Sequence, residues 1–408
     1  MKNKIDNLLK NLSNSLLQYA QLRDIEKLVG QFWDEEGISE AQYGIYGMSS
    51  WLILSSDLSF QNISAEQLAR YDHLINNCKL KLASWILIDN PAENENNLKQ
   101  IVELKTVIPK ICFAYFALSK CNDCDRPKTI LLERLRRGFI DSQGSWGELI
   151  NSPFGSPVVT AMVLRCVIND HNISREIIES AINYLLMHVE DTENTYLQLY
   201  IYNTLILLPT LKVNNRKNVE HKIKFCIKSL HSKVYYNPVQ FPNPTNVDYH
   251  DNGRTRYFRL PSDIILLESL ILLSPYNLLF IQTLVGYKVF MSLNKNIDGN
   301  LFKNDTSGHR AGGGYYVYAK SVIKTMSDVP KIKSNILIKI WSWYKYSYTF
   351  GLDFSWNVLI FYGSLTVSLF FHYYGYDWLR NIFFGIFIKT VLDAFKSLYN
   401  LSKTKIEP

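Results

Sequence analysis

The sequence has little of several features that define non-globular classes of protein. Glycine and proline number only 19 and 13 among 408 residues, which excludes a collagen-like or low-complexity chain. Charged residues make up only 20% of the chain, whereas 47% are hydrophobic and 13% aromatic, so an intrinsically disordered chain is excluded as well. The mean hydropathy of −0.07 argues against a polytopic membrane protein. A globular protein with a substantial apolar core is therefore expected.

Cysteine is also scarce. The six cysteines are scattered and lie mostly inside apolar helical patterns, as buried free thiols do, and a disulfide framework would be unusual in a chain of this length. Residues 1–28 interleave leucines with polar residues, which predicts an amphipathic helix, and they lack the continuous apolar core of a signal peptide. These features predict a reducing compartment. The formal net charge of +7 is modest, and we predict no nucleic-acid partner and no cofactor.

Apolar residues recur at three- and four-residue steps in most of the long segments. This period predicts helices over residues 65–87, 107–118, 129–139, 157–167, 176–188, 195–208 and 264–273. Convincing alternating strands are absent from the pattern. The breaks are short and carry turn residues, as at Ser152-Pro153. Short loops between many medium helices predict antiparallel helical hairpins and an all-α fold.

A weak repeat runs through this helical background. Its clearest unit is Gln143-Gly144-Ser145-Trp146-Gly147, followed by a small-residue helix start at Ser156-Pro157. Similar aromatic and glycine-containing segments precede helix starts at residues 32–52 and 298–318. Helical hairpins that repeat in this way must stack in order to bury their inner faces.

Residues 137–147 resemble the Gln-Trp repeat of the terpene cyclase and protein prenyltransferase superfamily, which includes squalene-hopene cyclase. The resemblance extends over residues 25–330, and its specific part is the middle unit with Gln143, Gly144 and Trp146. It implies an α/α toroid of paired antiparallel helices, in which the Gln side chain and the Trp ring tie one hairpin to the next. We therefore expect a toroid over residues 1–350 and a membrane hairpin with a cytoplasmic tail over residues 351–408.

The acidic motifs that this superfamily uses are missing from the sequence. Squalene-type cyclases protonate an alkene with an aspartic acid of an Asp-x-Asp-Asp motif, a general acid with a tuned pKa. The corresponding helix holds a single carboxylate, Glu103. Class I terpene synthases hold magnesium and diphosphate with Asp-Asp-x-x-Asp, and no such run is present. Whether the chain is an enzyme stays open, and no catalytic residue is assigned.

The sequence does not predict a zinc site like that of the protein prenyltransferases. Protein prenyltransferases hold one zinc ion with Asp, Cys and His. Cys121 and Cys124 have a zinc-like spacing, but no second Cys or His pair follows at a finger-type interval. His309 would have to join them from another loop, so two ordinary thiols are the favoured interpretation.

Two polar, cationic loops, at residues 250–259 and 305–314, are the candidate ligand-binding elements. Arginine forks bind phosphate bidentately, and neighbouring aromatic rings suit a planar or isoprenoid body. The alternative is that these arginines neutralise helix C-termini or pair with Asp251 and Asp263. The candidate ligand-binding residues are Arg254, Arg256, Tyr257, Arg259, His309 and Arg310.

The C-terminal part carries the longest apolar run. Residues 356–371 contain no charged residue, and an extension to Tyr376 adds only His372 as a group that charges near neutral pH. A run of about 20 such residues is enough to cross a bilayer as a helix. Tyr373, Tyr374, Tyr376 and Trp378 then form an aromatic belt. A second apolar run, at residues 382–395, contains Lys389 and Asp393.

Lysines flank the two apolar runs on both sides. By the positive-inside rule they predict a transmembrane hairpin with both ends cytoplasmic, in a bacterial inner membrane with the bulk of the chain facing the cytoplasm. The alternatives are one span followed by an interfacial amphipathic helix, and a helical hairpin buried in a soluble fold. The flanking lysines are Lys320, Lys324, Lys331, Lys333, Lys339 and Lys345 before the runs and Lys396, Lys403 and Lys405 after them.

Two functional hypotheses follow from these patterns. In the first, a membrane-attached toroid binds or processes an isoprenoid or another lipid-like ligand, including a phosphorylated one. In the second, which the missing cyclase acids favour, the toroid is a non-enzymatic ligand sensor or scaffold with a transmembrane output, such as a bacterial membrane-disrupting defence effector. The expected partners are the lipid bilayer, an isoprenoid or anionic small molecule, and further copies of the chain through the membrane segment.

Overall fold

The structure of the protein is a computed structural model. The N-terminal helix predicted within residues 1–28 and the glycine-containing segment at residues 298–302 lie outside the residues that it describes. The described residues are 44–56, 64–90, 97–168, 172–236, 245–251, 254–260, 262–273, 317, 320–322, 353–379, 381–385 and 388–389.

The chain divides into two compact units. The first comprises Met1–Pro330 and the second Lys331–Pro408.

The described part of the chain is mostly helical, as the apolar period predicts. In the first unit the helices are α3 (Ile45–Ser55), α4 (Ala65–Leu87), α5 (Leu98–Thr106), α6 (Ile108–Leu118), α7 (Asp125–Arg137), α8 (Pro157–Val167), α9 (Arg175–His188), the 3₁₀-helix η3 (Val189–Asp191), α10 (Thr195–Leu207), α11 (Val213–Tyr236) and α12 (Ser262–Leu273).

Local sequence signals fix where several of these helices begin. Ser64 and Gln67 form a capping box at the start of α4, because each side chain accepts a hydrogen bond from the other's backbone N–H. Ser156 caps α8 through the N–H of Val159, and Pro157 occupies the first turn, where a missing N–H costs nothing. The first residue of each helix determines which of its residues lie on the apolar face.

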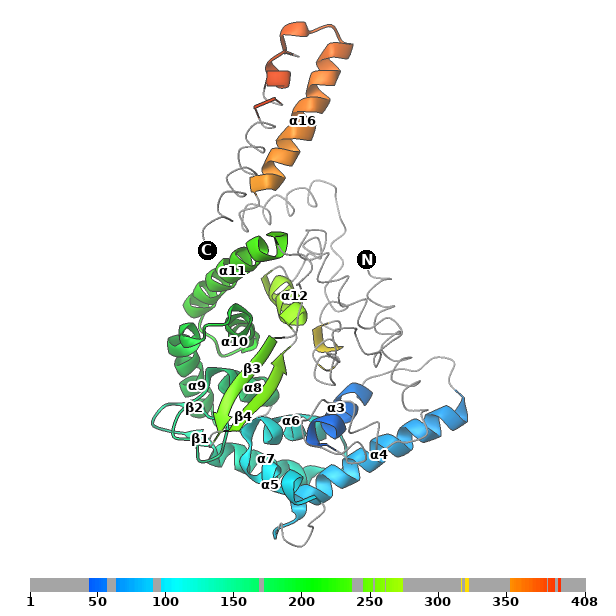
Figure 1. Cartoon of the computed structure of the whole chain (residues 1–408), viewed down its shortest axis with the longest axis vertical. Helices are drawn as coiled ribbons and strands as arrows, with labels where there is room; N and C mark the ends of the chain where they lie inside the picture. Colours follow the sequence, from blue (N-terminus) through cyan, green and yellow to red (C-terminus); the bar gives the residue numbers. More distant parts are fainter. Residues whose placement is uncertain are drawn as a thin grey trace. The chain divides into compact units, whose positions relative to one another are not determined.

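The helices of the first unit are arranged in two rows (Figure 1). In the inner row α3 contacts α6, α6 contacts α8, α8 contacts α10, and α10 contacts α12. The outer row consists of α4, α7, α9 and α11, each of which packs on a helix of the inner row. Nearly all residues of α3 and most residues of α10 are buried, as expected of helices that are apolar on all sides.

Two short antiparallel hairpins interrupt the helices, and here the prediction that strands are absent is wrong. Strands β1 (Phe139–Ile140) and β2 (Ser145–Trp146) flank the Gln-Trp loop, and β3 (Thr245–Asp251) pairs with β4 (Arg254–Leu260) along their whole length. The register pairs Asp251 with Arg254, so the two residues between them are Asn252-Gly253. Asn-Gly is the strongest short signal for a two-residue hairpin turn. The predicted cationic loop at residues 250–259 is therefore largely a β-hairpin.

The second unit contains α16 (Asp353–Tyr373), which coincides with the first apolar run. A turn with Gly375 at a positive φ of 75° follows, and residues 377–379, 381–385 and 388–389 are helical again. The ring of Phe371 stacks on that of Phe383 with centroids 5.7 Å apart, so the two arms pack as a hairpin. Among the residues that the structure describes, no helix combines the length and the apolarity needed to cross a membrane.

Candidate functional site

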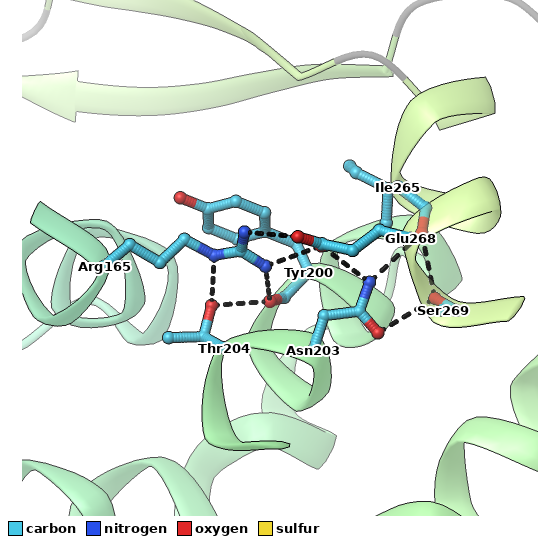
Figure 2. A network of polar contacts seen from close by, with 7 residues as sticks. All are labelled: Arg165, Tyr200, Asn203, Thr204, Ile265, Glu268 and Ser269. Atoms are coloured by element: carbon cyan, nitrogen blue, oxygen red, sulfur yellow. Dashed lines mark hydrogen bonds and ion pairs between the residues drawn. The ribbon is translucent and has the colours of Figure 1, made fainter. Parts of the chain in front are cut away.

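A network of polar side chains is buried within the inner row of helices (Figure 2). It extends from α8 across α10 to α12, so it joins three successive members of that row. An ion pair between Arg165 and Glu268 lies at its centre. The residues of the network are Arg165 from α8, Tyr200, Asn203 and Thr204 from α10, and Ile265, Glu268 and Ser269 from α12.

The guanidinium group of Arg165 is bound on every side. Its Nη1 and Nη2 donate to Oε1 and Oε2 of Glu268 at 2.9 and 2.8 Å, which is the bidentate fork geometry. Its Nε donates to Oγ1 of Thr204 at 2.6 Å, and Nη2 also donates to the Tyr200 carbonyl at 3.3 Å. The guanidinium carbon lies 4.4 Å from the centre of the Tyr200 ring, within the range of a cation–π contact. The side chain is therefore held rigidly in one orientation.

Asn203 holds the carboxylate from the other side. Its Nδ2 donates to Oε2 of Glu268 at 3.0 Å and to the carbonyl of Ile265 at 3.1 Å. The Ser269 hydroxyl lies 2.9 Å from Oδ1 of Asn203, which fixes the orientation of the amide. Every hydrogen bond described for Glu268 thus comes from an N–H donor, and its oxygens act as acceptors.

This arrangement is suited to stabilising the packing of three helices and is poorly suited to acid catalysis. A general acid must donate a proton to its substrate, whereas both oxygens of Glu268 accept hydrogen bonds from Arg165 and Asn203. A buried ion pair with additional hydrogen bonds is costly to break, because removal of one partner leaves the other charge buried and uncompensated.

The polar neighbours of the network are held in their neutral forms. Burial raises the pKa of the Tyr200 phenol well above its usual value, although the nearby Arg165 opposes this. Burial and a hydrogen bond with Cys166 raise the pKa of the Cys112 thiol as well. A thiol with a raised pKa is a poor nucleophile, since the thiolate is the reactive species. None of these groups is prepared for covalent catalysis.

Glu103, the carboxylate compared above with the cyclase acid, is also paired. Lys110 of α6 donates to its Oε2 at 2.7 Å, and both side chains are largely buried. The ammonium group lies 5.3 Å from the centre of the Tyr46 ring. Glu103 therefore forms a second structural ion pair, this one between α5 and α6.

The Gln-Trp loop is built as a tie between helices. Oε1 of Gln143 accepts a hydrogen bond from the N–H of Gly155 at 2.7 Å, and its Nε2 donates to the carbonyl of Pro153 at 3.0 Å. The indole Nε1 of the fully buried Trp146 donates to the carbonyl of Leu135 in α7 at 2.7 Å. The loop thus joins the end of α7 to the segment that begins α8.

Gly144 lets the same loop reach a third helix. Its φ of +69° is in the left-handed region. A Cβ atom at this position would lie 2.3 Å from Oγ of Ser180 in α9. Any other residue would be strained both by conformation and by space, so the glycine is required where the loop meets α9.

The predicted ligand-binding residues fall into two groups. Arg254, Arg256, Tyr257 and Arg259 all lie on β4. The register places them opposite Asp251, Tyr249, Asp248 and Asn246 of β3, respectively. His309 and Arg310 lie outside the described residues, so a common anion site stays a prediction.

The Cys121-x-x-Cys124 segment forms the turn between α6 and α7, with Asp123 at a φ of 61°. Burial raises the pKa of both thiols. Within the part of the chain that the structure describes, no group of three or more His, Cys, Asp or Glu side chains is placed to hold a metal ion.

The central ion pair was not among the residues that the sequence singles out, although a signal for it exists. Glu268 is the one charged residue in the apolar segment 264–273, and Arg165 is the one charged residue in the apolar segment 157–167. A charge in a helix that is apolar on all sides must be paired, because an isolated buried charge is too costly. Two such helices with opposite charges are therefore candidates for a direct contact.

The arrangement defines a class of protein, a mostly helical chain of layered helical hairpins with a separate C-terminal helical hairpin. Comparisons with protein-family models, with curated proteins and with solved structures find no match to this chain.

Proposed function

We propose that this protein is a membrane-attached α/α toroid, similar to those of the terpene cyclase and protein prenyltransferase superfamily, which binds an isoprenoid or another lipid-like ligand. The resemblance at Gln143, Gly144 and Trp146 motivates the proposal. The two rows of helices and the ties made by this loop support it, because a toroid needs paired helices that are joined from one hairpin to the next.

The observation that carries the closed toroid is a contact between α3 and Lys320, a residue that comes after α12 in the chain. Lys320 follows α12 in the chain, and its buried ammonium group donates to the carbonyls of Ile53, at 2.9 Å, and Leu54, at 3.1 Å, at the end of α3. It also contacts the carbonyl and the hydroxyl of Ser56. A lysine at a helix C-terminus is favoured by the exposed carbonyls and by the helix dipole. A segment that follows α12 in the chain is thereby tied to α3, the first member of the inner row, which supports closure into a ring.

Attachment to a bilayer through the second unit is the other half of the proposal. The lysine-rich flanks of the hairpin support an inner-membrane location with the bulk of the chain in the cytoplasm. Association of several copies through the hairpin is compatible with this location. The cationic residues of β4, together with His309 and Arg310, are the proposed contacts of a phosphorylated head group.

Binding of prenyl diphosphates to the purified full-length protein tests the ligand proposal. We expect saturable binding of farnesyl or geranylgeranyl diphosphate, which native mass spectrometry would detect, and a weakening of at least tenfold in Arg254→Ala/Arg256→Ala. Arg175→Ala, which removes an exposed arginine of α9, is the control and should bind like the parent protein. Intact protein that binds none of these compounds would contradict the proposal.

A second candidate function is a non-enzymatic sensor or scaffold with a membrane output, such as a bacterial membrane-disrupting defence effector. The observation that favours it is the state of Glu103 and Glu268, which both accept hydrogen bonds from cationic side chains. Expression in bacteria loaded with a membrane-potential dye separates the two functions. Depolarisation that disappears when residues 356–408 are deleted favours the effector, whereas an unchanged potential argues against it.

A further inference from the structure

In the helical hairpin of the second unit, small polar residues are buried and large apolar residues are exposed, which is the reverse of the usual arrangement in a water-soluble protein. Ser364 and Ser368, one turn apart on α16, are only 6% and 5% exposed. The residues that follow them, Leu369 and Phe370, are 59% and 55% exposed. In a helix packed against a water-soluble core the large apolar residues lie inside and the hydroxyl groups outside. Small residues between helices and large apolar residues outside are instead typical of helix pairs surrounded by lipid.

The exposed apolar side chains occur on both arms of the hairpin. On the returning arm Ile382, Phe384 and Ile388 are exposed, while Phe383 faces the first arm and stacks on Phe371. A folded protein partner would cover one face of the hairpin and would leave the other arm in water. A surrounding apolar medium accounts for exposure on both arms.

The turn between the arms has a different character. Tyr373 is 84% exposed, and Tyr374, Tyr376 and Trp378 are exposed beside it. Tyrosine and tryptophan have an apolar ring and a polar group, and they are enriched at the boundary between lipid and water. The hairpin therefore exposes large apolar side chains on both arms, with Lys389 as an exposed charge on the returning arm, and it has an interfacial tip. This is the order of polarity along a bilayer normal, since a lysine can extend its ammonium group toward the head groups.

We propose that the outer face of this hairpin is a lipid-contacting surface. Its arms lie among the acyl chains of a bilayer, and its aromatic tip lies in a head-group layer. This inference rests on the membrane attachment proposed above and identifies the residues that perform it. The surface consists of Leu369, Phe370, Tyr373, Ile382, Phe384 and Ile388.

Flotation with vesicles of phosphatidylcholine and phosphatidylglycerol tests the surface. The full chain should float with the vesicles. The triple variant Phe370→Ser/Ile382→Ser/Ile388→Ser should partition at least about 100-fold less, because each substitution removes a large apolar group from lipid. The matched control is Met187→Ser/Val213→Ser/Phe225→Ser, which removes three exposed apolar side chains from the first unit and should float like the parent protein.

The outcomes separate the surface from the attachment. If the parent protein floats and the hairpin triple variant floats equally well, the attachment stands and the proposed surface is wrong. If the parent protein stays with the unbound fraction and cross-links through the hairpin as a dimer, a second copy of the chain covers the hairpin, and both proposals fail. Equal far-UV circular dichroism of parent and variants establishes that a loss of flotation is not a loss of folding.

An independent readout comes from Trp378 at the tip. Brominated lipids should quench part of the tryptophan emission of the vesicle-bound protein, and Trp378→Phe should remove that quenched part. Quenching that is unchanged in Trp378→Phe would overturn the placement of the tip in the head-group layer.

Discussion

In the first unit the tryptophans Trp51, Trp85 and Trp146 are fully buried, whereas in the second unit Trp378 is largely exposed. The contrast extends to the polar side chains. The first unit buries the charges of Arg165 and Glu268 as a pair among large apolar residues. The hairpin buries Ser364 and Ser368 and exposes large apolar side chains, namely Leu369, Phe370, Ile382, Phe384 and Ile388. Helices occur in both units, but their surroundings differ. The rows of helices are surrounded by water, and the hairpin, as we propose, is surrounded by lipid.

The largest expected effect comes from breaking the central ion pair of the first unit. Glu268→Ala leaves the guanidinium of Arg165 buried without its carboxylate, which should lower the free energy of unfolding by about 3–5 kcal/mol. Chemical denaturation followed by circular dichroism measures this change.

A double variant sharpens the same test. In Arg165→Met/Glu268→Leu both charges are replaced by apolar groups, and most of the lost stability should return, since well-packed apolar residues often replace a buried ion pair at little cost. A double variant that is as unstable as Glu268→Ala would show that the ion pair itself, and not the orphaned charge, is what the inner row requires.

A smaller and more local effect is expected at the end of α3. Lys320→Met keeps the aliphatic stem and removes the ammonium group from the carbonyls of Ile53 and Leu54. Hydrogen bonds to a charged group contribute about 1.5–3 kcal/mol, so the amide protons of α3 should exchange with solvent at least about tenfold faster. Hydrogen exchange with peptide resolution measures this.

Two further variants distinguish the charge of Lys320 from its bulk. Lys320→Arg should keep most of the protection of α3, and Lys222→Met, which removes a largely exposed ion pair with Glu190, should leave α3 unchanged. Faster exchange spread evenly over α8, α10 and α12 would mean general destabilisation and would contradict a local role in closing the row.

The smallest effect is expected on the surface of the first unit. Arg175 and Glu179 form an exposed ion pair one turn apart on α9, and such pairs contribute little. Arg175→Ala should therefore change the free energy of unfolding by less than about 0.5 kcal/mol. A loss of 2 kcal/mol or more in the same denaturation experiment would show that α9 depends on contacts other than its buried face.

Much of the helical architecture could be predicted from the sequence. The segments 65–87 and 157–167 coincide with α4 and α8, because a serine cap stands before each apolar period and fixes where it starts. Gln143 and Trp146 could be selected in advance, since a Gln-Trp loop between helices is a local pattern. Their hydrogen bonds to Gly155 and Leu135 also span short distances in the chain.

The parts that were missed depend on contacts between distant residues or on turn chemistry. Arg165 and Glu268 are 103 positions apart, and no local period indicates that α8 and α12 both approach α10. The hairpin β3–β4 was missed because its Asn252-Gly253 turn was interpreted as part of a cationic loop, although the same pair predicts a two-residue turn. An isolated charge within an apolar helix and an Asn-Gly pair between two short runs were the overlooked signals.

The contact of Lys320 with the end of α3 can form only late in the synthesis of the chain. Ser56 is 264 positions before Lys320, and a ribosome that adds about 5–20 residues per second needs about 13–53 s to synthesise that interval. Throughout this time the last carbonyls of α3 must bind water or another temporary partner. The C-terminus of α3 in the nascent first unit therefore stays without its lysine cap until Lys320 has been added.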